Sequence, residues 1–187
     1  MNIDYKKPLI EEFIRNNKDK INWNYISQYQ KLSEDFIIEF KDKIDWYFIS
    51  QYQILSENFI REFQDKVSWY NISYYQKLNE NFIREFKDKV DWQYISKNQK
   101  LSENFIGEFQ DKVSWVCISI NQKLSEDFIR KFKYRINWNI LLNGYGYNCL
   151  YLNNNYKIES INYKSNYLEF DEFINLALKL ISLKAFQ

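Results

Sequence analysis

The sequence predicts an all-α protein: an α-solenoid of about six 23-residue helix-turn-helix repeats with a small non-repeat C-terminal cap. Three observations lead to this prediction. The tryptophans stand 23 residues apart. Each period carries two separate helix-start signals. Each period also carries roughly seven large apolar side chains, which two short helices bury only against stacked neighbours. The tryptophans are Trp23, Trp46, Trp69, Trp92, Trp115 and Trp138.

The first helix of each period is predicted to begin at the tryptophan. The residue before it is always Asn, Asp or Ser, as Asp45 is before Trp46, and such side chains accept hydrogen bonds from the free amides of a first helical turn. Residues spaced i, i+3, i+4 and i+7 share one helix face. In the second period these residues are Trp46, Ile49, Ser50 and Gln53. We therefore expect the tryptophans to pack in the core.

The second helix is predicted to begin after a Leu-Ser or Leu-Asn pair. Ser33 is such a cap, and acidic residues follow it in the first turn, where the helix dipole favours negative charge. Phe36, Ile37 and Phe40 form its apolar stripe. On the other face Glu39 and Lys43 are spaced i, i+4, a spacing that repeats in later periods, and this predicts ion pairs along the helix.

Two polar residues recur on the apolar face of the first helix. We expect the serine to be small because neighbouring helices approach each other there. The glutamine is expected either to form a ladder of hydrogen bonds between periods or to cap helix ends, because a buried amide needs partners. The recurring glutamines are Gln30, Gln53, Gln76, Gln99 and Gln122.

Three domains are predicted: an N-terminal lead (1–8), the helical-repeat solenoid (9–144) and a non-repeat capping region (145–187). The first period is degraded, as expected for a terminal repeat. Asn17, for example, stands where the next period has Phe40.

The capping region is expected to hold a β-hairpin and a last helix. Two apolar segments, 149–152 and 156–161, flank an Asn-rich turn. Asp171 is predicted to cap a helix from Glu172 to about Phe186. We expect this helix to cover the end of the last repeat; contact between copies of the chain, or attachment to a membrane surface, is an alternative.

Composition argues against catalysis. The chain has no histidine, which removes the commonest general base and metal ligand. Its two cysteines, Cys117 and Cys149, are too isolated for a zinc site or a disulfide framework. We therefore predict a non-enzymatic protein with no catalytic residue, no cofactor and no metal. A net charge of +1 argues against nucleic acid as the partner. The N-terminus lacks a signal-peptide pattern and no apolar run is long enough to span a bilayer, so we expect a cytoplasmic location and no membrane.

The candidate binding site consists of positions that vary while the repeat frame stays fixed. Positions one and five residues after each tryptophan lie on one helix face, away from the apolar stripe. These positions and the next one are rich in tyrosine, which is enriched at protein-binding hot spots. The predicted partner-binding residues are Tyr47, Gln51, Tyr52, Tyr70, Tyr74, Tyr75, Gln93, Lys97, Val116 and Ile120.

Other interpretations stay open at this point. Variable residues at these positions are also expected if the face is simply exposed to solvent and binds nothing. A self-assembling structural protein that associates through the last helix is a second function. A single-stranded nucleic-acid binder is a third, with stacking on tyrosines and with cations from Lys77, Lys97, Lys100 and Lys123.

The repeat resembles known sequences. The repeat unit resembles uncharacterised 23-residue helical repeats in proteins of large DNA viruses and phages, over about residues 9–142. The resemblance lies in the order Leu-Ser-Glu-Asn-Phe-Ile-Arg-Glu-Phe, then Asp-Lys-Val, Trp, Ile-Ser and Gln. The resemblance carries no assigned activity. It implies a viral protein involved in host interaction, such as an inhibitor of a host protein that acts in the host cytoplasm, or a virion protein.

Overall fold

The computed structural model describes residues 3–144, 149–152, 155–158 and 170–184. The chain is an α-solenoid of 23-residue helical repeats with a non-repeat C-terminal segment, as predicted. It divides into two compact units, unit 1 (Met1–Gln99) and unit 2 (Lys100–Gln187). No helix among the described residues combines the length and the apolar character that crossing a bilayer requires.

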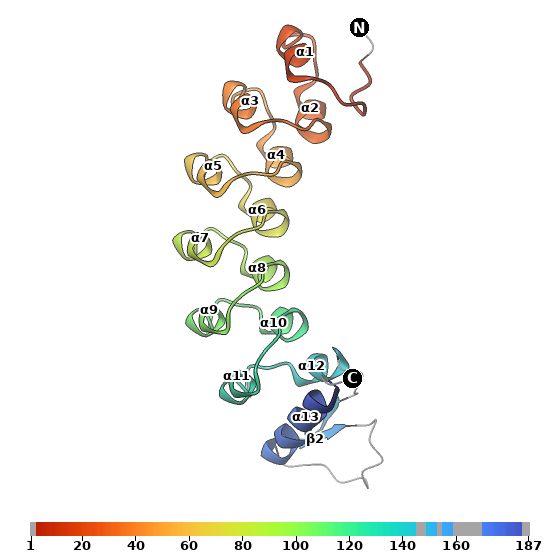
Figure 1. Cartoon of the computed structure of the whole chain (residues 1–187), viewed down its shortest axis with the longest axis vertical. Coiled ribbons are helices and arrows are strands. Elements are labelled where there is room, and N and C mark those ends of the chain that lie inside the picture. Colours follow the sequence, from red (N-terminus) through yellow and green to blue (C-terminus); the bar gives the residue numbers. More distant parts are fainter. Residues whose placement is uncertain (1–2, 145–148, 153–154, 159–169, 185–187) are drawn as a thin grey trace. The chain divides into compact units, whose positions relative to one another are not determined.

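Unit 1 stacks its helices in two columns (Figure 1). One column holds the first helix of each repeat and the other holds the second helix. The first helices are α2 (Trp23–Tyr29), α4 (Trp46–Tyr52), α6 (Trp69–Tyr75) and α8 (Trp92–Asn98). The second helices are α1 (Glu11–Asn16), α3 (Glu34–Glu39), α5 (Glu57–Glu62) and α7 (Glu80–Glu85).

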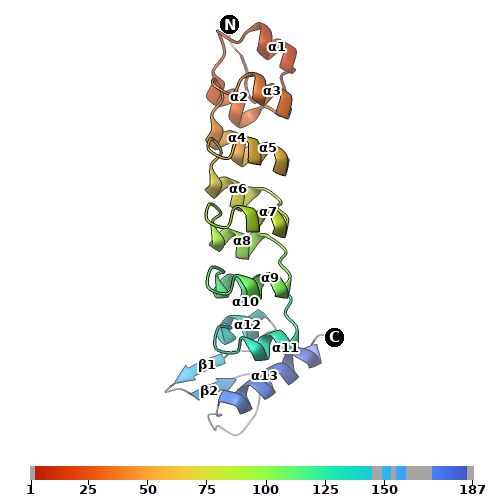
Figure 2. The same ribbon diagram turned by 90° about the vertical axis from the view of Figure 1, so that its left-hand side faces the viewer.

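Unit 2 continues the repeat and then departs from it. Its repeat helices are α9 (Glu103–Glu108), α10 (Trp115–Asn121), α11 (Glu126–Lys131) and α12 (Trp138–Gly144). An antiparallel hairpin of β1 (Cys149–Leu152) and β2 (Asn155–Ile158) follows, with Cys149 opposite Ile158 and Leu152 opposite Asn155. The last element is α13 (Phe170–Lys184), beside the hairpin in Figure 2. The predicted hairpin is confirmed, with Asn155 in the second strand rather than in the turn.

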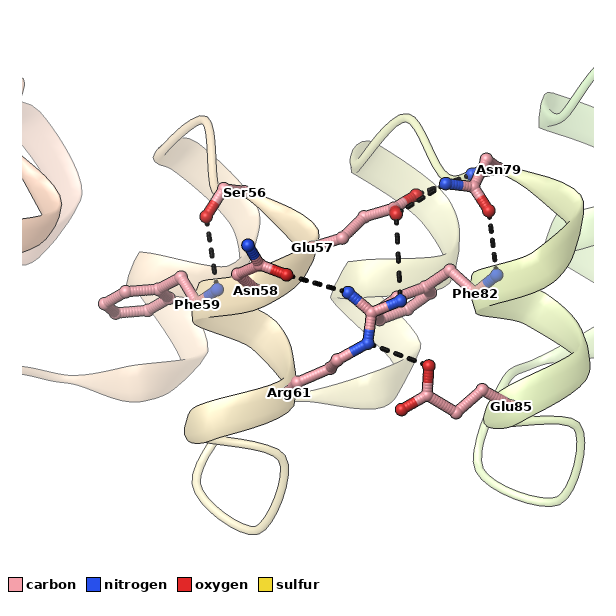
Figure 3. Close-up of polar contacts among 8 residues, drawn as sticks. All are labelled: Ser56, Glu57, Asn58, Phe59, Arg61, Asn79, Phe82 and Glu85. Atoms are coloured by element: carbon pink, nitrogen blue, oxygen red, sulfur yellow. Dashed lines mark hydrogen bonds and ion pairs between the residues drawn. The ribbon is translucent and has the colours of Figure 1, made fainter.

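The predicted helix caps are confirmed. The Asp45 carboxylate accepts from the backbone N–H groups of Tyr47 and Phe48, and the Ser56 hydroxyl accepts from the N–H of Phe59 (Figure 3). One predicted cap is wrong: α13 begins at Phe170, so Asp171 lies inside the helix rather than before it. The predicted end at Phe186 lies outside the described residues.

The tryptophans pack between the two columns, as predicted. The Trp46 ring stacks on Phe59 and Phe63 of the following second helix, at 6.1 and 5.1 Å between ring centroids. Its indole N–H donates to the Lys41 carbonyl at 3.0 Å. Ile49 on the same face is fully buried. Trp46 is half-buried, its ring stacks on two phenylalanines and its only donor is satisfied, so it serves packing between the two helices rather than binding.

The glutamines form the predicted ladder between repeats. The Gln53 amide oxygen accepts from the backbone N–H of Leu32 at 3.0 Å, and its nitrogen donates to the Gln30 carbonyl at 2.8 Å. Gln76 and Gln99 make the equivalent bonds one and two repeats later. These side-chain amides are buried, and their hydrogen bonds go to the main chain of the preceding repeat. This requirement explains why positions 30, 53, 76 and 99 of unit 1 are all glutamine.

The recurring serine does more than leave room for a neighbour. The Ser27 hydroxyl donates to the Trp23 carbonyl at 2.8 Å and accepts from the backbone N–H of Asp45 at 2.9 Å. Ser50 and Ser73 accept in the same way from the next cap residue. The serine therefore joins the start of one first helix to the middle of the preceding one.

The ion pairs predicted within the second helices of unit 1 are wrong. Lys43 contacts Asp19 at 3.1 Å, and Glu39 contacts Arg15 at 2.7 Å; both partners belong to the preceding repeat. The reason is that α3 ends at Glu39. Beyond that point the chain turns, and an i, i+4 spacing no longer places two side chains on one helix face.

The N-terminal lead takes part in the stack. The Tyr5 hydroxyl accepts from the backbone N–H of Asn22 at 2.9 Å, the bond that a serine makes in later repeats. Gln30 reaches the lead as later glutamines reach the repeat before them: it donates to the Tyr5 carbonyl and accepts from the N–H of Leu9. Residues 5–9 thus replace a missing first helix.

Helix α13 covers the last repeat of unit 2, as predicted. Phe173 packs on Trp138 with ring centroids 5.3 Å apart, and Ile174 and Ala177 join the same buried cluster with Leu142. In unit 1 the tryptophan receives its aromatic partner from the second helix that follows it. Helix α13 therefore occupies the role of that missing helix, and its apolar face is covered by the same chain.

Candidate interaction surface

The structure places the predicted partner-binding residues on the outer side of the first helices. The side chains of Tyr47, Tyr52, Tyr70 and Tyr75 are between 47% and 51% exposed. They are exposed because the tryptophan, isoleucine, serine and glutamine of the same helices turn towards the core. The other predicted residues of unit 1 are half-buried or exposed, and they are Gln51, Tyr74, Gln93 and Lys97.

Contacts between successive repeats hold these side chains in place. The Gln51 amide donates to the Tyr75 hydroxyl at 3.1 Å. The hydroxyls of Tyr70 and Tyr94 lie 2.9 Å apart in a hydrogen bond, and Tyr74 packs edge-on against Tyr94 at 4.7 Å between centroids. An aromatic surface that is already ordered loses little side-chain entropy when a partner binds.

The hydrogen bond with Tyr70, followed by partial desolvation, raises the pKa of Tyr94 to about 12. The phenol therefore stays protonated and keeps this contact at neutral pH. The pair is a fixed structural element of the surface rather than a proton-transfer group, because a catalytic acid or base works with a pKa near the operating pH.

Sequence reasoning missed the position two residues after each tryptophan. Tyr25 is 47% exposed there and stacks on Tyr5 at 5.3 Å, and Tyr94 is half-buried. The sequence did indicate this position, since it is as rich in aromatic residues as the neighbouring positions, but it lies nearer the buried face of the helix. We call the following side chains of unit 1 the tyrosine band: Tyr25, Tyr29, Tyr47, Tyr52, Tyr70, Tyr74, Tyr75 and Tyr94.

Asn71 occupies the same position, two residues after Trp69, and is fully buried. Its amide nitrogen donates to the Tyr47 carbonyl at 2.9 Å, which ties α6 to α4. Its amide oxygen is buried without a hydrogen-bond partner. The residue acts as a bridge beneath the tyrosine band.

A pocket opens at one edge of the band. It has a volume of about 490 Å³, and Tyr29, Tyr52 and Ile54 contribute to its wall together with Lys31. Ile54 is 92% exposed and stands where other repeats carry a lysine, such as Lys31. Ile54 therefore adds apolar surface beside two half-exposed tyrosines at this edge of the band.

In unit 2, helix α10 presents the two remaining predicted residues. Val116 and Ile120 are 46% and 58% exposed, at the positions that carry Tyr70 and Tyr74 in unit 1. The neighbouring Cys117 is a free thiol and is buried.

The described residues offer no cluster of three or more His, Cys, Asp or Glu side chains that is able to hold a metal ion. No family model, curated protein or solved structure matches the chain.

Proposed function

We propose that this protein is a non-enzymatic interaction scaffold that binds a partner protein through the tyrosine band. The observation that carries the proposal is the row of half-exposed tyrosines on α2, α4, α6 and α8. Those of α6 and α8 are ordered by hydrogen bonds and ring contacts across repeats. Tyrosine gives a large, rigid contact area with a polar tip, which suits protein recognition.

Charge also distinguishes the two columns of unit 1. In the first helices and the turns after them (22–33, 45–56, 68–79 and 91–99) the acidic residues are Asp45 and Asp91, and both cap helices. Lys31, Lys77 and Lys97 are exposed on the same segments. This surface suits a partner segment that brings apolar anchors and carboxylates. The resemblance to viral and phage repeats extends the proposal to an inhibitor of a host protein.

The alternative of self-assembly through the last helix has less support. The face of α13 that would join two copies is buried against α12 through Phe173, Ile174 and Leu178. The tyrosine band, in contrast, leaves Tyr47, Tyr52, Tyr70 and Tyr75 about half exposed in unit 1.

The test is a photo-crosslinking capture from native lysate. A photoreactive phenylalanine replaces Tyr52 in the full chain, alone and combined with Tyr47→Ala, Tyr70→Ala and Tyr74→Ala. We expect one protein to crosslink and the triple substitution to remove it, while far-ultraviolet circular dichroism stays unchanged. The matched control places the same probe at Tyr134, a residue that is 80% exposed and lies outside the band.

Crosslinks that are identical at both positions, or that survive the triple substitution, contradict the proposal. Capture of nucleic acid in place of protein, with binding that falls steeply as salt is added, favours the nucleic-acid alternative. Crosslinks only between copies of the chain favour self-assembly.

A further inference from the structure

The second helices of unit 1 show how this fold holds an arginine. Arg61 extends from α5 across the start of α7 (Figure 3). Its guanidinium donates to Glu85 at 2.8 Å and to Asn58 at 3.0 Å, and its carbon lies 5.0 Å from the centroid of the Phe82 ring. Glu57 approaches it at 4.0 Å. Arg15 makes the same contacts with Glu39 and the Phe36 ring.

In α9 of unit 2 this arginine is missing while most of its surroundings remain. Gly107 stands where α5 has Arg61. Glu103, Asn104 and Phe128 stand where Glu57, Asn58 and Phe82 surround that arginine. Phe128 is 7% exposed and Phe82 is fully buried, because Phe82 lies beneath a guanidinium and Phe128 does not.

The missing side chain leaves a groove between α9 and α11. It has a volume of about 510 Å³, and its lining includes Glu103, Asn104, Gly107 and Phe128. A β-carbon at Gly107 would meet the Phe132 ring at 3.6 Å, an ordinary van der Waals distance. The groove therefore has room for the side chain that the repeat frame places there.

The charge of the groove favours a cation. The carboxylates of Glu103 and Asp127 line it against the ammonium of Lys131; Glu108 also lines it but already has an interaction of its own. Glu103 accepts hydrogen bonds from Ser125, but Glu57 makes the equivalent bonds with Asn79 and still approaches Arg61. Lys131 replaces the fourth contact, Glu85, and its ammonium lies over the Phe132 ring at 5.3 Å.

We propose that the groove at Gly107 is a binding site for an arginine side chain from another polypeptide. The entering guanidinium stacks on Phe128, donates to Asn104 and forms an ion pair with Glu103, as Arg61 does with Phe82, Asn58 and Glu57. An arginine fits better than a lysine because its planar head both stacks on a ring and donates to two acceptors at once. This site is independent of the tyrosine band.

The test is a backbone-amide NMR titration of the full chain with N-acetyl-arginine methylamide. We expect saturable shifts at Gly107 and Asn104, in the millimolar range that a single side chain reaches. The citrulline analogue has the same shape without the charge, and it should produce no saturable shifts. Gly107→Arg fills the groove from within and should abolish the shifts; circular dichroism checks that this variant folds.

A second variant fixes the sign of the ligand's charge. Lys131→Glu places a carboxylate at the position equivalent to Glu85, which pairs with Arg61. The substitution should tighten binding by about threefold, the size of one exposed ion pair. The proposal is overturned by an absence of saturable shifts, by equal shifts from citrulline, or by a Lys131→Glu affinity that equals or falls below that of the unsubstituted protein.

Discussion

At the scale of single residues, the glutamine of each first helix carries the junction between repeats in unit 1. Gln76 accepts from the backbone N–H of Leu55 at 3.2 Å and donates to the carbonyls of Ser50 and Gln53 at 3.0 and 2.7 Å. All three partners are main-chain groups in the preceding repeat. One side chain therefore satisfies a turn whose donors and acceptors are hidden from water.

Gln76→Ala should lower the free energy of unfolding by about 1–3 kcal/mol, because it leaves the buried N–H of Leu55 without an acceptor. Urea denaturation followed by circular dichroism measures this change. Gln51→Ala is the matched control: Gln51 is half-buried and bonds only to the Tyr75 hydroxyl among the contacts described, so its loss should cost less than about 0.5 kcal/mol. Equal costs for the two variants would contradict the role of the ladder.

The hydroxyl pair of the tyrosine band predicts a titration. The pKa of Tyr94 is raised to about 12 by its hydrogen bond with Tyr70. The folded state thus holds this proton more tightly than the unfolded chain, so the stabilisation is complete below about pH 10 and is lost as the pH rises through about 12. Tyr70→Phe should move the pKa of Tyr94 back towards 10, as seen by ultraviolet difference absorbance. Tyr74→Phe keeps its ring beside Tyr94 and should leave that pKa close to 12.

At the scale of elements, the first and the last repeat of the array are covered by different structures. At the start, a turn in the N-terminal lead supplies the Tyr5 hydroxyl and backbone carbonyls in place of a first helix. At the other end, α13 supplies Phe173 to Trp138, and Asn175 accepts from the Arg130 guanidinium at 2.9 Å.

Phe173→Ala should expose the end of the last repeat. The substitution removes a fully buried ring, a change that costs about 3–5 kcal/mol. We expect faster hydrogen exchange at the amides of α12 and a lower melting temperature. Asn175→Ala serves as the control, because it removes one exposed hydrogen bond with Arg130 and should cost less than about 1 kcal/mol. Unchanged exchange in α12 after Phe173→Ala would show that α13 does not stabilise that helix.

Sequence reasoning predicted what depends on neighbours along the chain. The caps at Asp45 and Ser56 and the apolar stripes follow from local spacing, and the structure confirms them. The ion pairs were wrong because Lys43 contacts Asp19 across a repeat junction, a contact set by how repeats stack rather than by position on one helix. Tyr94 was missed for a related reason, since its partners Tyr70 and Tyr74 come from the preceding repeat. The groove at Gly107 also emerges only when two repeats lie side by side.

At the scale of the whole molecule, the fixed frame and the variable surface are separate properties. The core residues and the glutamine bonds recur with the period, whereas the exposed positions change from Tyr70 and Tyr74 in unit 1 to Val116 and Ile120 in unit 2. A scaffold of this kind tolerates a change of its surface without a change of fold.

Removal of one full period should preserve the fold of unit 1. Without residues 57–79, Ser56 precedes Glu80 just as it now precedes Glu57, and every cap keeps its frame. We expect the same ellipticity per residue and cooperative unfolding in urea, with lower total stability because one interface is lost. The control removes only 57–68, which places two first helices in succession and should abolish cooperative unfolding. Equal losses in both variants would refute the modular frame.

The glutamine ladder has a consequence for how such a gene changes. Each junction in unit 1 joins a glutamine side chain to main-chain atoms, which every amino acid except proline provides in full. A duplication or loss of one whole period in the coding sequence therefore produces a chain whose new neighbours already recognise each other. Unequal recombination can lengthen or shorten the array in a single event, and later substitutions on the exposed positions then give each copy its own binding preference.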